Sequence, residues 1–301
     1  MRCYKSALIL SRHPGRVAVA GALTIAFSAI LVREADVAPA TAAVFRCAYA
    51  LPALGLLAWI ERRRYGPRTR RELRLSMWAG VFFAADLICW HYAIHDVGAG
   101  LATVLGNLQV VLVGLVAWLT LGERPDPRVI AAVPIALFGI LLISGVLGSA
   151  AYGNDPARGV VFGIATGLTY AGFILVLRQS GRDLQRPVAP LFEATAFATV
   201  FALIGGLVIG DIDLVPSWPA HGWLVLLALS SQVVGWLLIS LSLPRLPAAL
   251  TSVLLTVQPV GSVILGVILL GESPSLLQLV GVACIFSGII VATARRSRVP
   301  A

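Results

Sequence analysis

Long apolar runs follow one another along almost the whole of this 301-residue chain. A helix needs about 20 mostly apolar residues to cross a lipid bilayer. Runs of that kind, separated by short polar connections, cover residues 16–33, 39–60, 76–95, 99–121, 128–148, 158–178, 188–210, 220–243, 248–270 and 275–294. Lipid offers no partner for backbone N–H and C=O groups, so runs of this length indicate helices. The sequence therefore predicts an all-α integral membrane protein with ten transmembrane helices.

Composition excludes the main soluble classes. Hydrophobic residues make up 58% of the chain and charged residues 12%, whereas a soluble domain has about 45–50% and about 25%. The first apolar run follows Arg12 and Arg16 and lacks a small-residue cleavage site, so we expect an uncleaved span. The four cysteines are scattered and form no C-x-x-C pair. We therefore expect no metal and no cofactor.

Basic residues indicate how the spans are oriented. If the N-terminus lies inside, 20 of the 23 Lys and Arg side chains fall in inside segments, and only Arg33 and Arg158 fall in outside loops. Such a bias marks the cytoplasmic side of a membrane protein. We expect both termini in the cytoplasm, a location in the cytoplasmic (inner) membrane, and no nucleic-acid partner for the formal charge of +9.

The second half of the chain repeats the first. A shift of 149 residues aligns 97–144 with 246–293 without a gap and gives 13 identities in 48 positions. The polar matches set Gln109 on Gln258 and Glu123 on Glu272. Two units of five helices, 1–148 and 149–301, must enter the membrane from opposite sides because five is odd. Inverted repeats of this kind recur in secondary transporters, with the substrate site near the midplane between them.

The repeated motifs resemble a known family, the EamA type of the drug/metabolite transporter superfamily. The matching residues are Leu121-Gly122-Glu123-x-Pro125 with Gly139, Leu270-Gly271-Glu272-x-Pro274 with Gln278, Gly281 and Gly288, and Arg46. Glu193, the counterpart of Arg46, departs from the pattern. The resemblance covers essentially the whole chain and is greatest to YddG-like exporters, which implies export of amino acids, aromatic ones included.

Three full charges lie inside the predicted spans: Arg46, Asp86 and Glu193. Ionisable groups in a membrane are costly and usually face an interior or wet cavity. At about 1.5 Å per residue, Arg46 and Asp86 lie at similar depths, roughly 10 and 13 Å from the outer ends of neighbouring spans. We hypothesise an Arg46–Asp86 ion pair, which either locks two helices together or contacts substrate.

Aromatic and polar residues gather around this depth. Trp90, His91 and Tyr92 form either an interfacial aromatic belt or the mouth of a cavity. The remaining candidates, which serve either helix packing or substrate binding, are Thr103, Asn107, Gln109, Tyr170, Gln232, Trp236, Ser252, Thr256 and Gln258. Gln109 and Gln258 are expected to approach each other across the pseudo-twofold axis. Glu123 and Glu272 are expected to be turn or cap residues, and Ser273 with Pro274 to begin the last helix.

This set of amides, hydroxyls, aromatics and few charges suits a zwitterion with a variable side chain. The leading prediction is a secondary transporter that exports amino acids by alternating access and works as a monomer in the lipid bilayer. A proton-coupled multidrug or metabolite exporter is the alternative, although spans 16–33 and 158–178 contain no acidic residue. A sugar-nucleotide exchanger is disfavoured, because Arg46 is the one Lys or Arg inside the predicted spans and a phosphorylated substrate needs more positive charge. A membrane enzyme is disfavoured, because the sequence contains no catalytic motif.

Overall fold

The computed structural model describes residues 14–109, 111–112, 127–143, 147, 151–242, 245, 255 and 257–293. Within these ranges the regular structure is entirely helical. The helices are α2 (Pro14–Ala26), α3 (Ser28–Ala35), α4 (Pro39–Tyr65), α5 (Arg70–Val97), α6 (Ala99–Gly106), α8 (Pro127–Ile143), α9 (Pro156–Ser180), α10 (Val188–Ile209), α11 (Ala220–Leu227), the π-helix η1 (Ala228–Gly235), α12 (Trp236–Ser242), α14 (Val257–Leu270) and α15 (Leu276–Thr293).

Six helical segments of the described chain are long and apolar enough to cross a membrane. They are Pro14–Ala35, Pro39–Tyr65, Arg70–Val97, Pro156–Ser180, Val188–Ile209 and Ala220–Ser242. Each coincides with a predicted span. The other predicted spans correspond to shorter described helices: α6, α8, α14 and α15. The all-helical membrane fold is thus confirmed, while parts of the fourth, fifth and ninth predicted spans lie outside the described residues.

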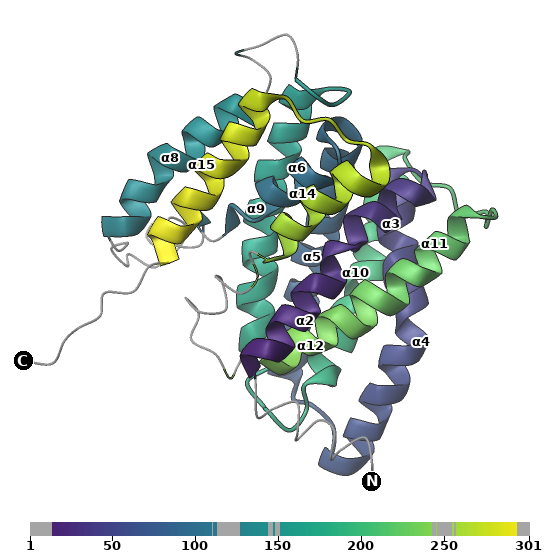
Figure 1. Cartoon of the computed structure of the whole chain (residues 1–301). Helices are drawn as coiled ribbons and strands as arrows, with labels where there is room; N and C mark the ends of the chain where they lie inside the picture. The colour runs from purple at the N-terminus through teal and green to yellow at the C-terminus, as the bar shows by residue number, and fades with distance from the viewer. Residues whose placement is uncertain are drawn as a thin grey trace, which may run out of the picture.

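The helices pack in a small set of pairs, which Figure 1 shows. α5 packs along α9, and α4 along α10, with α5 also against α10. The purple α2 and α3 lie against α12 and α11, while α6 crosses α14. α8 and α15 lie side by side at one edge of the molecule and touch the rest sparingly.

Glycine allows two of these pairs to approach closely. Between α8 and α15, a Cβ built on Gly139 would lie 2.7 Å from the carbonyl oxygen of Gly281, and one on Gly281 would lie 2.7 Å from the carbonyl oxygen of Gly139. Between α2 and η1, a Cβ on Gly21 would lie 3.0 Å from the carbonyl oxygen of Gly235. In a membrane the hydrophobic effect does not drive helices together, so their association depends on close van der Waals packing. Small residues at such crossings allow the helix backbones to come that close.

Side chains define where several helices begin. Thr69 and Glu72 form a capping box at the start of α5, and the Asp155 side chain accepts a hydrogen bond from the Arg158 N–H at the start of α9. The last helix begins at Leu276, and Ser275 accepts a hydrogen bond from the Gln278 N–H. Ser273 and Pro274 were expected to begin this helix, which starts two residues later than that.

Candidate functional site

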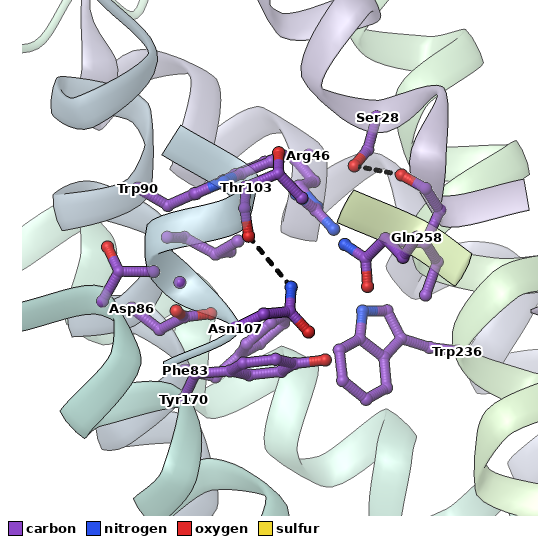
Figure 2. A pocket seen from close by; sticks show the side chains of 14 residues that line it. Ser28, Arg46, Phe83, Asp86, Trp90, Thr103, Asn107, Tyr170, Trp236 and Gln258 are labelled. Carbon is purple, nitrogen blue, oxygen red and sulfur yellow. Dashed lines mark hydrogen bonds between the residues drawn. The ribbon is translucent and has the colours of Figure 1, made fainter. Parts of the chain in front are cut away.

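A small cavity lies in the middle of the bundle, lined by residues from both halves of the chain (Figure 2). The space open to the centres of water molecules is about 40 Å³. The lining residues are Ile25, Ser28, Arg46, Phe83, Asp86, Leu87, Trp90, Thr103, Gly106, Asn107, Thr166, Tyr170, Trp236 and Gln258. The cavity therefore joins α2, α3, α4, α5, α6, α9, α12 and α14 with the turn that follows α6.

Arg46 supplies the positive charge. Its side chain is buried, and its Nε donates a hydrogen bond of 3.2 Å to Oε1 of Gln232. Gln232 in turn donates from Nε2 to Oγ1 of Thr195, at 3.1 Å. The guanidinium carbon lies 5.6 Å from the ring centroid of Trp90. Nη1 is buried and has no hydrogen-bond partner among the described residues.

Asp86 supplies a negative charge to the same cavity. The predicted ion pair is not formed, because no nitrogen of Arg46 lies within 4.0 Å of an Asp86 oxygen. The side-chain amide of Gln232 takes that place beside Arg46. Consequently a guanidinium and a carboxyl group line one cavity without direct contact between them.

The π-helix η1 explains the unexpected partner. Its eight residues, Ala228–Gly235, are followed at once by Trp236 in α12. A π-helix widens the turn and changes the direction of the side chains after it, which is why such segments are frequent at functional sites. Here the segment brings Gln232 to Arg46 and Trp236 to the cavity.

Aromatic rings form one wall. Trp236 meets Phe83, Phe173 and Tyr170 edge to face, with centroids 5.8, 4.9 and 6.0 Å away. The Nε1–H of Trp236 is buried and lacks a hydrogen-bond partner in the part of the chain that the structure describes. This wall therefore combines a flat apolar surface with a free donor, as Figure 2 shows for Phe83, Tyr170 and Trp236.

Polar residues of α6, of the turn after it and of α14 also line the cavity. Asn107 donates from Nδ2 to the carbonyl oxygen of Thr103, at 2.9 Å, and Thr103 donates to that of Ala99, at 2.8 Å. Gln258 reaches the cavity with Oε1 buried and unpartnered. The structure records no hydrogen bond between Gln258 and Gln109, which lies instead beside the Tyr170 hydroxyl. The approach of the two glutamines across the axis stays a prediction.

Four described candidates are not lining residues of this cavity: His91, Tyr92, Gln109, and Gln232, which contacts it through Arg46. His91 is buried, with Nδ1 3.0 Å from the carbonyl oxygen of Pro39. Tyr92 donates a hydrogen bond to Asp211 at 2.6 Å and stacks on Phe162. The His91 ring lies 5.5 Å from the ring of Trp90, which does line the cavity, so His91 is next to the cavity wall. Two further candidates, Ser252 and Thr256, lie outside the described residues.

Sequence reasoning missed several wall residues. Phe83, Asp86, Leu87 and Trp90 follow one another at steps of three, one and three, which places them on one face of a helix. This spacing was available in the sequence and could have identified Phe83 and Leu87. Ser28 had no such signal, because it reaches the cavity just after the turn at Phe27 that separates α2 from α3.

Dense polar contacts close the end of the bundle that the charge pattern assigns to the outside. Arg158 donates to Asp96 from Nε at 2.8 Å and from Nη2 at 2.6 Å. Glu272 accepts hydrogen bonds from the N–H groups of Ala99 at 2.5 Å and Gly100 at 3.1 Å, so it caps α6 from the other half. Its predicted role as a cap is confirmed, whereas Glu123 lies outside the described residues.

One family model matches the chain twice, once in each half. The model of the EamA-like transporter family matches residues 16–145 and again residues 157–294. The chain belongs to the EamA-like transporter family. Within the drug/metabolite transporter superfamily, this EamA-like protein is a multi-pass membrane transporter, as its apolar helices require.

Several relatives of this EamA-like transporter carry the same general description. It is 26% identical over 222 residues, 74% of this chain and 77% of the relative, to an uncharacterized transporter of Archaeoglobus fulgidus. It is 24% identical over 256 residues to the uncharacterized transporter YxxF of Bacillus subtilis, covering 83% and 80%. YetK of the same organism is 22% identical over 237 residues, covering 75% and 68%.

A solved structure shares the fold. A protein crystal structure with 19% sequence identity superposes with a TM-score of 0.62, covering 93% of this chain and 98% of the other. At this identity the similarity concerns architecture alone.

Proposed function

We propose that this EamA-like transporter exports amino acids, aromatic ones included, by alternating access. The observation that carries the proposal is the presence of free donors and acceptors in one buried cavity. Among the described residues, Arg46 Nη1 and Trp236 Nε1 are unpartnered donors and Gln258 Oε1 is an unpartnered acceptor, and the carboxyl group of Asp86 lines the same cavity. A buried polar group without a partner costs stability unless a ligand satisfies it.

A zwitterion matches this arrangement. Its carboxylate would accept hydrogen bonds from the Arg46 guanidinium and the Trp236 indole, and its ammonium would donate to Asp86 and Gln258. The rings of Phe83, Tyr170 and Trp236 offer a flat apolar surface for an aromatic side chain. A highly anionic substrate fits less well, because Asp86 faces the same space.

The size of the cavity indicates the state of the transport cycle. A water needs about 10–15 Å³ of such space, so 40 Å³ accommodates roughly three waters. An aromatic amino acid is much larger, and the cavity must widen to admit it. The present arrangement corresponds to a contracted state, and the contacts of Arg158 and Glu272 close it on the outer side.

The helix packing supports the inverted repeat of units 1–148 and 149–301. In this repeat, spans one to five are equivalent to spans six to ten in the same order. The contact of span three with span six (α5 with α9) is then equivalent to the contact of span eight with span one, which is α11 and α12 with α3 and α2. The pairs α4 with α10, α6 with α14, and α8 with α15 each map onto themselves. Such a twofold relation places the cavity on the axis, where repeat-built transporters bind substrate. The charge bias supports a cytoplasmic location for both termini.

A proton-coupled exporter of drugs or metabolites is the second candidate. Asp86 favours it, because a buried carboxylate in a transport cavity is able to exchange a proton for a cationic solute. The described helices α2 and α9 contain no Asp or Glu that would serve this purpose.

Flux into liposomes separates the two candidates. Purified protein should carry radiolabelled aromatic and aliphatic amino acids above the rate of empty vesicles, both with and without a pH gradient. Movement of cationic dyes that depends strictly on the gradient, with no amino-acid flux, would favour the second candidate. Arg46→Lys and Arg46→Gln should reduce amino-acid flux, while Arg33→Gln, outside the cavity, should not.

A further inference from the structure

A second hollow, of about 460 Å³, lies at the arginine-rich ends of α4 and α5 and the beginning of α10. It shares no lining residue with the central cavity. α4 has 27 residues, which span about 40 Å at 1.5 Å per residue, whereas the hydrocarbon core is about 30 Å thick. The last turns of α4 therefore reach the headgroup region, and the hollow lies at that level.

One side of the hollow is apolar and open to the surroundings. Trp59 and Leu73 are 50% and 43% exposed, and Phe192 of α10 lines the same hollow. The Arg63 guanidinium carbon lies 4.1 Å from the Trp59 ring centroid. A tryptophan that is half exposed and stacked with an arginine is typical of a membrane interface.

The rim of the hollow contains three arginines: Arg62, Arg68 and Arg186. Two of them are already paired. Arg68 is bonded to Glu193 and donates to the Ser180 carbonyl oxygen at 2.7 Å. Arg186 donates to Asp183 at 2.7 Å.

Two other acidic side chains near the hollow already accept hydrogen bonds at the starts of helices. Glu61 accepts hydrogen bonds from the N–H groups of Val188, at 3.0 Å, and Ala189, at 2.9 Å, at the start of α10. Glu72 accepts from the N–H and Oγ1 of Thr69, at 2.7 and 2.8 Å. No acidic side chain of the described part of the molecule pairs with Arg62, which is exposed.

We propose that this hollow binds one anionic phospholipid of the leaflet that meets the arginine-rich ends of α4 and α5. Its phosphate lies against Arg62, with the paired Arg68 and Arg186 adding positive potential, and its first acyl carbons lie over Trp59, Leu73 and Phe192. Basic pockets between transmembrane helices recognise anionic headgroups by this chemistry. A soluble phosphate offers the same charge but leaves the open apolar wall unused, which favours the lipid. The assignment does not depend on the transported substrate.

Quenching of tryptophan fluorescence tests the proposal on the full chain. Nanodiscs of phosphatidylcholine are prepared with a small fraction of phosphatidylglycerol brominated on the acyl chain near the headgroup. The signal of Trp59 is the difference between the protein and its Trp59→Phe variant, and Trp78, 54% exposed on α5 and outside the hollow, reports bulk lipid in the same way. We expect stronger quenching of Trp59 than of Trp78.

Two arginine variants make the test specific. Arg62→Ala should weaken the Trp59 quenching. One arginine near an anionic surface contributes about fivefold to lipid affinity, so the variant should need about five times more phosphatidylglycerol for the same quenching. Arg71→Ala, which removes an exposed arginine of α5 that does not line the hollow, should leave it unchanged. Equal effects of the two variants, or equal quenching of Trp59 and Trp78, would show general attraction to anionic lipid and overturn the proposal.

Thermal unfolding separates lipid from free phosphate. In pure phosphatidylcholine nanodiscs, adding phosphatidylglycerol should raise the melting temperature in an Arg62-dependent way, and inorganic phosphate or glycerol phosphate at the same concentration should not. An Arg62-dependent shift with the soluble phosphates and none with the lipid would assign the hollow to a soluble ligand and refute the lipid site.

Discussion

Oε1 of Gln232 accepts a hydrogen bond from Nε of Arg46 across 186 residues of chain, and this contact joins the π-helix to α4. It fixes the buried guanidinium while leaving Nη1 free to face the cavity. The bond thus determines both where the positive charge lies and which of its donors remains for substrate.

Removing this bond should weaken substrate binding. Gln232→Leu leaves the Arg46 Nε unpaired, and loss of a hydrogen bond to a charged group costs about 1.5–3 kcal/mol of stability. Because the guanidinium is then no longer held in place, we expect a lower melting temperature and a higher Kd for the amino acid. Gln232→Glu keeps the acceptor but neutralises Arg46, so it should retain the melting temperature and still lose binding. Val234→Ala, on the exposed side of the same π-helix, is the control. Unchanged Kd in both glutamine variants would contradict the role given to this contact.

The cap on α6 should contribute measurably to stability. In Glu272→Ala the N–H groups of Ala99 and Gly100 lose their acceptor, and a buried unsatisfied donor costs about 1–3 kcal/mol. We expect a lower melting temperature for Glu272→Ala than for Glu34→Ala, whose side chain is exposed. Equal melting temperatures would mean that water or another group replaces the carboxylate.

The crossing of α8 and α15 should tolerate no added side-chain atom. Gly139→Ala brings a Cβ to 2.7 Å from the Gly281 carbonyl oxygen, so the backbones must separate. Overpacking of this kind costs about 1–3 kcal/mol. Leu137→Ala, on the exposed face of α8, should change the free energy of unfolding little. A Gly139→Ala protein as stable as the Leu137→Ala protein would show that the helices are free to move apart.

The pair formed by Arg158 and Asp96 should hold the outer end closed. Asp96→Asn removes the charge from a bidentate contact whose acid is fully buried. We expect a larger population of the outward-open state, measured as faster modification of a cysteine at Thr103 by a membrane-impermeant reagent in a cysteine-free background. The control is Asp155→Asn, whose Oδ2 lies 3.9 Å from the Arg158 Nε and whose Oδ1 acceptor for the Arg158 N–H is kept in asparagine. Equal rates for the two variants would contradict a gating role.

Much of the architecture and part of the site could be predicted from sequence, for an identifiable reason. Lipid allows few polar groups inside a span, so each such group carries information. Arg46, Asp86, Asn107 and Gln258 were identified in this way, and all four line the cavity. The apolar runs located the long helices by the same physical constraint.

The rest depends on geometry that spacing does not encode. Depth along ideal α-helices suggested Asp86 as the partner of Arg46, but the π-helix changes the side-chain directions of its segment and presents Gln232 instead. Glu272 was expected to cap a helix, yet nothing local shows that the helix is α6, 172 residues away. Contacts between the two halves become visible only once the halves are packed.

The most direct test of the account measures which charges of the substrate the cavity requires. In liposomes containing the purified protein, phenylalanine flux is challenged with unlabelled phenylalanine, with phenethylamine, which lacks the carboxylate, and with phenylpropionate, which lacks the ammonium. The account predicts that only the zwitterion competes strongly, and that Arg46→Gln loses preference for phenylalanine over the amine, while Asp86→Asn loses preference over the acid. Strong competition by phenethylamine alone, unaffected by Arg46→Gln, would contradict recognition of an amino acid by Arg46 and Asp86.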